Sequence, residues 1–137
     1  MGQMLEVNLT NDLAEIPMLT ESVERYCADA GVSPAVVFHI VLALDEFITN
    51  VVSYAYDDRA RHSIRVTLNL ADGRLTTEIE DDGRPFDPLS RPDPDISASL
   101  EDREVGGLGT YLIKQVMDEV TYHRSENRNR LSLVKRL

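Results

Sequence analysis

SPAVVFHIVLALDEFITNVVSYAY, residues 33–56, is the strongest structural signal in the chain and predicts one long amphipathic helix. Ser33 is a typical helix N-cap, and Pro34 suits the first helical position because the nitrogen there needs no hydrogen-bond partner. Apolar residues then recur at steps of three and four: Val37, Ile40, Val41, Leu44, Phe47, Ile48 and Val51. The pattern predicts a helix from Pro34 to about Tyr56 whose apolar face lies in the core.

The segments around this helix predict an α/β sandwich. Alternation of apolar and polar residues predicts strands at 5–9, 63–70, 75–80, 119–124 and 131–134. Helical spacing predicts further helices at 13–30 and from 106 to about 116. Asp72-Gly73 is typical of tight hairpin turns. We therefore expect one domain, residues 1–137, that is a two-layer α/β sandwich with a mixed, mostly antiparallel sheet and helices on one face.

Composition limits the kind of protein this is. The 137 residues hold 14 Lys and Arg against 24 Asp and Glu, and the net charge of −10 is opposite to that of a nucleic-acid binder. The single cysteine, Cys27, cannot form an internal disulfide, and the N-terminus does not resemble a signal peptide. The longest apolar run, residues 35–44, is too short for a membrane span. We expect a cytoplasmic protein that contacts neither nucleic acid nor membrane directly.

Glu46 and Asn50 form the first polar pair that could carry chemistry. On a helix, their side chains point in directions only about 40° apart, away from the apolar face. A carboxylate and an amide one turn apart can order a water or supply oxygen ligands to Mg²⁺. The alternative is an ordinary solvated helix face, because His39, Ser53 and Asp57 lie on the same side. On this pair alone, the solvated face is favoured.

IEDDGRPFD, residues 79–87, follows a predicted strand directly. Asp81 at the strand end can accept a hydrogen bond from an exocyclic amine such as adenine N6. Gly83, two residues later, lets a planar base approach the backbone. Turns that combine an acidic residue with glycine are common, so this pattern alone favours a solvated turn.

Gly106-Gly107-Leu108-Gly109-Thr110 opens the last predicted helix, after a proline-rich stretch from 82 to 104 that is too long for an ordinary connection. The free N–H groups of a first helical turn, at the positive end of the helix dipole, suit a phosphate. The sequence contains neither a Walker GxxxxGK[ST] motif nor GxGxxG after a strand. A glycine-rich hinge is an equally good interpretation of this stretch.

In their order and spacing, the three clusters resemble the GHKL ATPase superfamily with its Bergerat nucleotide-binding fold. The N box would be Glu46–Asn50, the first glycine box Asp81–Gly83 and the second Gly106–Gly109. The resemblance is closest to the stand-alone bacterial anti-sigma-factor serine-protein kinases. Length, DDGRPFDP, GGLGTYLIKQVMDEV and the closing NRLSLVKRL carry it over nearly the whole chain. It implies that residues 84–105 form an ATP lid.

The resemblance implies a role for each matching residue. Asn50 would ligate Mg²⁺ on the ATP phosphates, and Glu46 would orient or deprotonate the attacking hydroxyl. Asp81 would bind the adenine amine, with Gly83 allowing close approach. The remaining site residues would frame the phosphates through backbone N–H groups: Gly106, Gly107, Leu108, Gly109 and Thr110.

One departure from the family pattern falls near the last strand. Many superfamily members carry a Gly-Thr pair there, where this chain has Asn129-Arg130-Leu131-Ser132. Ser132 and Arg130 are the candidates for the missing group at the back of the nucleotide site.

The resemblance also implies a function: an ATP- and Mg²⁺-dependent serine/threonine kinase, commonly a homodimer, that sequesters a sigma factor and phosphorylates an anti-anti-sigma (STAS) partner. The alternative is a catalytically silent nucleotide-binding adapter that only sequesters a regulatory partner. A third is an ATPase switch with water as the acceptor. Glu46 together with Asn50 favours the kinase over the adapter, because a pure adapter has no chemical need for that carboxylate.

Overall fold

The computed structural model of the protein describes residues 4–58, 60–90 and 107–137. Its strands are β1 Met4–Thr10, β2 Ser63–Ala71, β3 Arg74–Asp81, β4 Glu119–Ser125 and β5 Arg128–Arg136. Its main helices are α1 Ile16–Asp29, α2 Pro34–Asn50 and α3 Gly107–Val116. Single helical turns lie at Leu13–Glu15, Val51–Ala55 and Pro88–Ser90. Every predicted helix and strand is present, with shifts at the ends.

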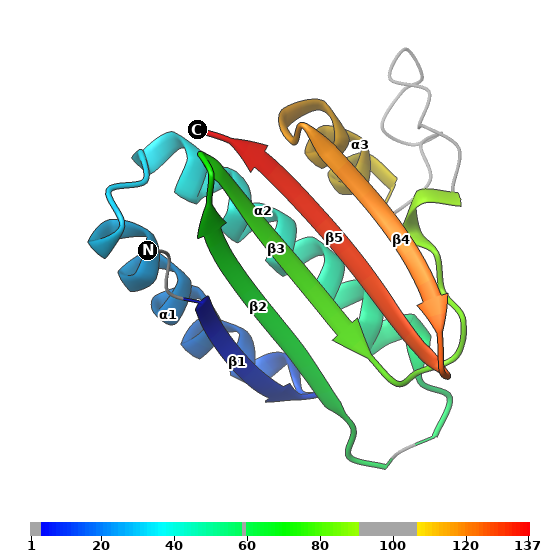
Figure 1. The fold of residues 1–137 in the computed structure, drawn as a ribbon. Helices are drawn as coiled ribbons and strands as arrows, with labels where there is room; N and C mark the ends of the chain where they lie inside the picture. The colour runs from blue at the N-terminus through cyan, green and yellow to red at the C-terminus, as the bar shows by residue number, and fades with distance from the viewer. Residues whose placement is uncertain (1–3, 59, 91–106) are drawn as a thin grey trace.

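The strands form one sheet in the order β1-β2-β3-β5-β4, and the helices cover one of its faces (Figure 1). The two-layer sandwich is therefore as predicted. All four pairings in the described part are antiparallel, so the sheet contains no parallel component there. Because β4 takes the outer position, β5 pairs with the central strand β3 and places Asn129 directly opposite Asp81.

Helix α2 begins as the sequence predicts but ends earlier. The Ser33 hydroxyl accepts the backbone N–H of Val36, and Pro34 is the first helical residue. The α-helix ends at Asn50, and Val51–Ala55 continue as a π-helical turn. Such turns are rare and often lie at functional sites. The change in helical geometry therefore falls directly after one of the predicted site residues.

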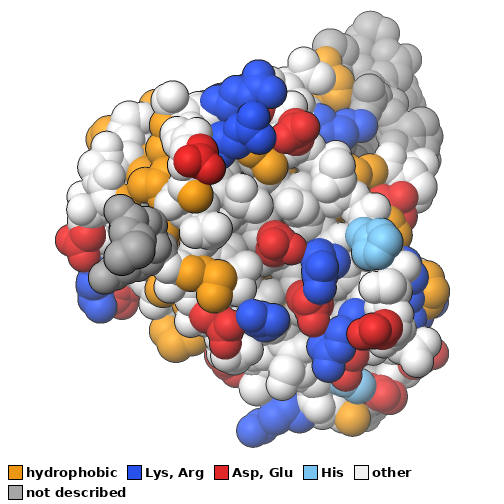
Figure 2. All heavy atoms as spheres, in the orientation of Figure 1, with side chains coloured by type: hydrophobic (Ala, Val, Ile, Leu, Met, Phe, Trp, Pro, Cys, Tyr) orange, Lys and Arg blue, Asp and Glu red, His pale blue; other side chains and the backbone are white. Residues whose placement is uncertain are grey.

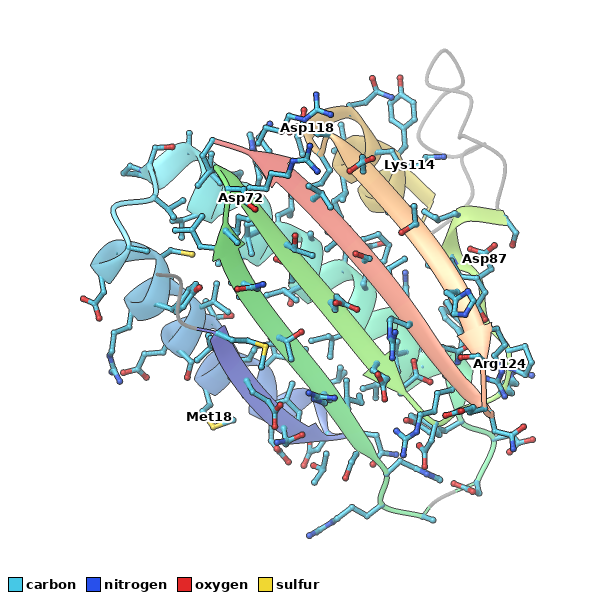
Figure 3. All side chains as sticks on the ribbon, in the orientation of Figure 1. Met18, Asp72, Asp87, Lys114, Asp118 and Arg124 are labelled. Carbon is cyan, nitrogen blue, oxygen red and sulfur yellow. The ribbon has the colours of Figure 1, made fainter. Side chains whose placement is uncertain are left out.

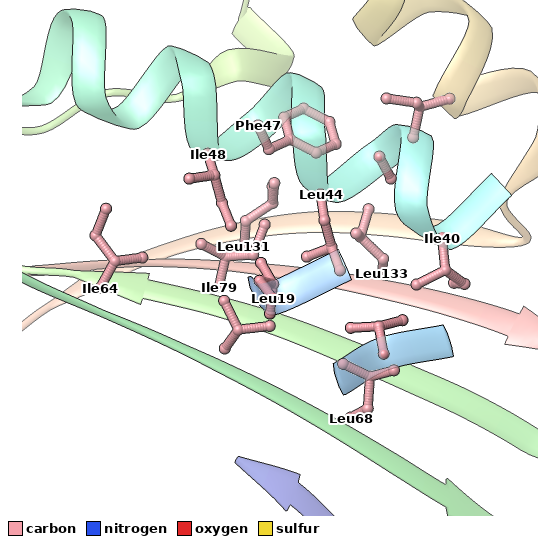
Figure 4. Packing of buried hydrophobic residues seen from close by; sticks show 14 of the residues in the cluster. Leu19, Ile40, Leu44, Phe47, Ile48, Ile64, Leu68, Ile79, Leu131 and Leu133 are labelled. Carbon is pink, nitrogen blue, oxygen red and sulfur yellow. The ribbon is translucent and has the colours of Figure 1, made fainter. Parts of the chain in front are cut away.

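The core lies between α2 and the sheet. Ile40, Leu44, Phe47 and Ile48 project from α2 toward apolar residues of the strands (Figure 4). Those residues include Ile64, Leu68, Ile79, Leu131 and Leu133, and α1 adds Leu19, Val23 and Cys27. Full burial of each large side chain is worth roughly 1.5–3 kcal/mol. This packing fixes α2, and with it Glu46 and Asn50, against the sheet.

The helical segment Pro34–Ala55 is also long and apolar enough to cross a membrane, with a mean hydropathy of 1.8 over its most apolar window. Length and composition alone are weak evidence, because the core helix of a folded domain has the same properties. In this fold, 39% of that window is buried inside the protein. The packing of Ile40, Leu44, Phe47 and Ile48 in the core accounts for part of this hydropathy.

The other face of the sheet carries interspersed acidic and basic side chains (Figure 2). Arg65 pairs with Glu6 at 2.8 Å, and Arg130 pairs with both Glu78 and Glu80 across the β3–β5 ladder. Opposite charges on neighbouring strands stabilise an exposed sheet face modestly. The alternation of apolar and polar residues along the strands thus gives the sheet an apolar inner face and a charged outer face.

Candidate nucleotide site

Asp81 is the last residue of β3 and is almost completely buried. Its Oδ1 accepts the backbone N–H of Gly83 at 2.9 Å, which closes the turn after the strand. Gly83 has no room for a side chain: a Cβ there would lie 2.5 Å from the backbone oxygen of Ala55. The glycine is required because the turn passes directly against the end of the π-helical segment.

Asn129 fills the position at the back of the site. Its Nδ2 donates to Asp81 Oδ1 at 2.9 Å and to the Arg84 carbonyl at 2.8 Å. Its Oδ1 accepts the Tyr122 hydroxyl, the Phe86 backbone N–H and an Arg124 guanidinium N–H. The side chain is 4% exposed, so these contacts take the place of water.

The prediction that Ser132 or Arg130 fills this position is wrong. Strand side chains alternate between faces, and Asn129 and Leu131 face the core while Arg130 lies between them on the other side. Arg130 is occupied there by its ion pairs with Glu78 and Glu80. Ser132 is two residues from Arg130 and faces the same outer side, opposite Glu78 in the ladder.

Asp81 and Asn129 stand at the polar end of a small apolar cavity. Its volume is about 20 Å³, and its other lining residues are Phe47, Val51, Ile79, Phe86, Pro88, Tyr122 and Leu131. Phe86 also stacks on Tyr54, with ring centroids 5.7 Å apart. An apolar slot that ends in one acceptor carboxylate offers a hydrogen-bond partner to the exocyclic amine of a heterocycle. The slot is too narrow for such a ring until its walls move apart.

This end of the sheet lies near Arg124 at the end of β4, far from the β2–β3 turn that Asp72 marks (Figure 3). Arg124 donates to the Gly83 carbonyl at 2.7 Å. Burial, together with the charge of Asp82, raises the pKa of the Asp81 carboxyl above its ordinary value, and the bonds from Asn129 and Gly83 and the charge of Arg124 only partly offset this rise. The network thus opposes the tendency of a buried carboxylate to take up a proton.

Glu46 and Asn50 lie on α2, one turn apart, across from the start of α3. A Cβ on Gly109 would lie 2.6 Å from the Glu46 carboxyl carbon, so a larger residue there would displace this carboxylate. Glu46 Oε1 is buried and has no hydrogen-bond partner among residues 4–58, 60–90 and 107–137. Asn50 is 8% exposed at the junction with the π-helical turn. A helix N-terminus stabilises a nearby carboxylate, but the unpaired oxygen still needs a polar partner.

The remaining predicted site residues lie at the start of α3 and in the proposed lid. Gly107 and Leu108 begin α3 as predicted, and Thr110 is buried in its first turn. Gly106 lies outside the described residues. The proposed lid, 84–105, is described only as far as residue 90.

Sequence reasoning missed Asn129, Tyr122 and Arg124 as members of the site. The departure from the Gly-Thr pattern near the last strand was a signal for Asn129 alone, and the candidates that it raised were Ser132 and Arg130. No group of three or more His, Cys, Asp or Glu side chains that could hold a metal occurs among residues 4–58, 60–90 and 107–137. A Mg²⁺ ion here would depend on Asn50 and on oxygens of the bound phosphates, as magnesium commonly does.

The sheet order, the helices on one face and the polar groups at one end of α2 define the GHKL ATPase fold. Residues 9–135 match the family model of the histidine kinase-like ATPase domain. The chain therefore belongs to this family.

Curated relatives point in the same direction. The chain is 31% identical over 96 residues to the serine/threonine-protein kinase BtrW of Bordetella bronchiseptica, which covers 70% of this chain and 68% of BtrW. It is 28% identical over 109 residues to the serine-protein kinase RsbW of Listeria monocytogenes, and the match covers 77% of this chain and 69% of that RsbW. RsbW of Staphylococcus epidermidis is 26% identical over 136 residues, or 96% of this chain and 85% of that protein.

A solved structure has the same fold. The crystal structure of the RsbU and RsbW domains of Rv1364c from Mycobacterium tuberculosis superposes with a TM-score of 0.71. The match covers 98% of this chain but only 32% of that one, at 19% sequence identity. At this identity the match shows the fold, and the present chain spans about a third of that larger protein.

Proposed function

We propose that this protein is an ATP-dependent serine/threonine protein kinase of the anti-sigma-factor type, which sequesters a sigma factor and phosphorylates a small anti-anti-sigma (STAS) partner. The family membership supports ATP binding, and the relatives named above are serine or serine/threonine kinases. The observation that carries the proposal is Glu46, whose buried, unpaired carboxylate oxygen faces the start of α3 one turn before Asn50.

Different site residues bind the adenine and the phosphates of the nucleotide. Asp81 accepts a hydrogen bond from the amine of adenine, which enters the apolar slot. Asn50 would hold a Mg²⁺ ion, which when bound neutralises charge on the phosphates. The N–H groups that begin α3 face the phosphates. Each of these contacts positions the γ-phosphate relative to Glu46.

Glu46 acts on the acceptor hydroxyl. Its carboxylate takes the proton from a serine or threonine of the partner while that oxygen attacks the γ-phosphorus and the bond to ADP breaks. Phosphorylation adds about two negative charges to the partner. This protein carries a net charge of −10, so the product is repelled and the sigma factor can be bound again.

The setting of this reaction is part of the proposal. A single cysteine, buried in α1, fits a reducing cytoplasm. We place the protein there as a homodimer that regulates transcription through its partners and does not contact nucleic acid itself. The excess of acidic residues supports that last point.

Binding and transfer are tested separately. Titration calorimetry with ATP and ADP, each with and without Mg²⁺, measures binding in the wild type and in Asp81→Asn and Asn50→Ala. We expect Asp81→Asn to lose both nucleotides and Asn50→Ala to lose the Mg²⁺ dependence. Transfer of labelled γ-phosphate to a purified STAS protein from the same organism then tests the kinase. A wild type that binds ATP but transfers nothing to that protein or to water would favour the silent adapter.

A further inference from the structure

The Asn129 carboxamide is saturated with hydrogen bonds. Two acceptors take its Nδ2 hydrogens, and three donors approach its Oδ1, as described above. The amide orientation is fixed by these partners, because a flipped amide would set donors against donors. Asn129 is therefore unable to rotate and offer its groups to a ligand.

The same contacts determine what Asp81 can do. Oδ1 of Asp81 already accepts two hydrogen bonds, from Gly83 and Asn129. Oδ2 accepts none from the described residues, so it is the oxygen left for a ligand. A hydrogen bond donated to a carboxylate stabilises its ionised form. Asn129 thus favours the ionised form of the Asp81 carboxyl, which can only accept hydrogen bonds at the end of the slot.

The amide also links the carboxylate to the segment that follows. Asn129 bonds the Arg84 carbonyl and the Phe86 N–H as a neighbouring strand would. Phe86 lines the cavity, and the backbone N–H of Arg84 is held by the Ala55 carbonyl at 2.8 Å. One side chain therefore sets both the acceptor and one wall of the slot.

We propose that Asn129 is a positioning residue that determines base specificity: it holds Asp81 as an ionised acceptor, so that the slot takes purines with a 6-amino group and rejects those with a 6-oxo group. A 6-oxo base would bring an oxygen against the carboxylate. A protonated Asp81 could donate to that oxygen instead. The inference rests on the proposed nucleotide site and concerns a residue outside its recognised motifs.

The test compares ADP with inosine diphosphate, which has a carbonyl oxygen in place of the 6-amino group. Calorimetry gives both affinities between pH 5.5 and 8 for the wild type and for Asn129→Asp. This substitution keeps the size and the Oδ1 contacts and replaces only the NH₂ donor with an oxygen. Two adjacent carboxylates bind a shared proton more tightly. We expect ADP affinity to fall about tenfold at neutral pH, the loss of a bond to a charged group.

The specificity readout separates positioning from stability. In Asn129→Asp, the preference for ADP over inosine diphosphate should shrink. As the pH is lowered, the variant should lose ADP binding at a higher pH than the wild type does. Asn69→Asp makes the same chemical change at an exposed position of β2 and should behave as the wild type. An unchanged preference and an unchanged pH midpoint in Asn129→Asp would overturn the inference, whatever its melting temperature.

Two further outcomes remain informative. If the wild type binds neither nucleotide, the proposed site fails and this inference fails with it. If the wild type binds ADP but Asn129→Asp does not fold, Tyr122→Phe replaces it, since this change removes only one donor to Asn129 Oδ1. A smaller loss of the ADP preference is then expected, and full retention of it would count against the role of Asn129.

Discussion

The two ends of the candidate site differ in how completely their polar groups are satisfied. At the base end, Asp81 Oδ1 and the Asn129 amide are fully engaged by neighbouring residues. At the phosphate end, Glu46 Oε1 is buried without a partner in the part of the chain that the structure describes. A buried unpaired acceptor costs about 1–3 kcal/mol. The base end is thus held in place by neighbouring residues, with Asp81 Oδ2 left for a ligand, whereas the phosphate end retains a buried oxygen whose partner must come with the substrates.

Each end also contains a glycine, and the two glycines face different neighbours. Gly83 lies against the backbone of Ala55, which cannot move without disturbing the π-helical turn. Gly109 lies against the carboxylate of Glu46, the far end of a flexible side chain. The rigid contact belongs to the base end, where neighbouring residues fix Asp81 Oδ1 and the Asn129 amide. The adjustable contact belongs to the end where chemistry is proposed.

The largest expected effect is at the phosphate end. Glu46→Gln keeps the shape of the side chain and removes its ability to take a proton. Phosphotransfer should fall by about 10²–10⁴-fold, the usual contribution of general-base catalysis. ATP affinity, measured by calorimetry, should stay within about twofold, because the base end supplies adenine binding without it.

Asp45→Asn is the matched control for this experiment, since Asp45 is the exposed neighbour on the same helix. It should retain the wild-type rate. Normal phosphotransfer by Glu46→Gln would remove Glu46 from the role of base.

At the base end, Asp81→Asn should reduce ATP and ADP affinity alike, by roughly 10–100-fold, which is the value of a hydrogen bond to a charged group. Thermal stability at neutral pH should not fall in parallel, because burial already disfavours the ionised carboxyl. Asp82→Asn, one residue along and exposed, is the control. Equal nucleotide affinity in wild type and Asp81→Asn would contradict the adenine role.

The sequence predicted the fold well because its signals are local. Ser33-Pro34 and the apolar spacing of α2 fix a helix start and a buried face, and Asp72-Gly73 fixes a hairpin. Both turn residues have positive φ, 54° and 72°, as that hairpin type requires. The π-helical end of α2 was not predicted, because an apolar stripe continues through residues 51–55 with either helical geometry.

The site was predicted less completely, and the reason is long-range pairing. Asn129 reaches Asp81 only because β5 pairs with β3 in a particular register, and a shift of one residue would have placed Arg130 on the inner face instead. Nothing local in Asn129-Arg130-Leu131-Ser132 fixes that register. Motif residues on one element, such as Glu46 and Asn50, could be found from spacing alone.

The two glycines offer a direct comparison of the two ends. Gly83→Ala should destabilise the protein by about 1–3 kcal/mol, the usual cost of overpacking, because the new methyl group meets fixed backbone. Gly109→Ala should destabilise it less and should reduce phosphotransfer more, because the Glu46 carboxylate can be displaced. Urea unfolding of both variants shows which one loses more stability, and their phosphotransfer rates show which one loses more activity. Equal effects in both assays would show that the two ends respond alike.

The smallest expected effect lies beside the base end, where His62 stacks on Tyr56 with ring centroids 4.1 Å apart. Its ring nitrogens lie 2.7 Å from Asp58 and 3.5 Å from Asp82, the residue after Asp81. The hydrogen bond to Asp58 raises the pKa of His62 above 6.5, and the charges of Asp58 and Asp82 act in the same direction. Proton binding is therefore tighter in the folded state.

A raised histidine pKa stabilises the fold fully below pH 6.5, and this stabilisation is lost as the pH rises through the folded-state value. His62→Gln should therefore lower the melting temperature more at pH 5.5 than at pH 8.5, where only the loss of stacking on Tyr56 remains. Thermal melts across this range measure the difference, and His123→Gln, on the exposed side of β4, is the control. The effect should be small because the facing carboxylates are partly exposed and screened by solvent. A difference between the variants that is the same at every pH would show that His62 acts only by packing beside the Asp81 turn.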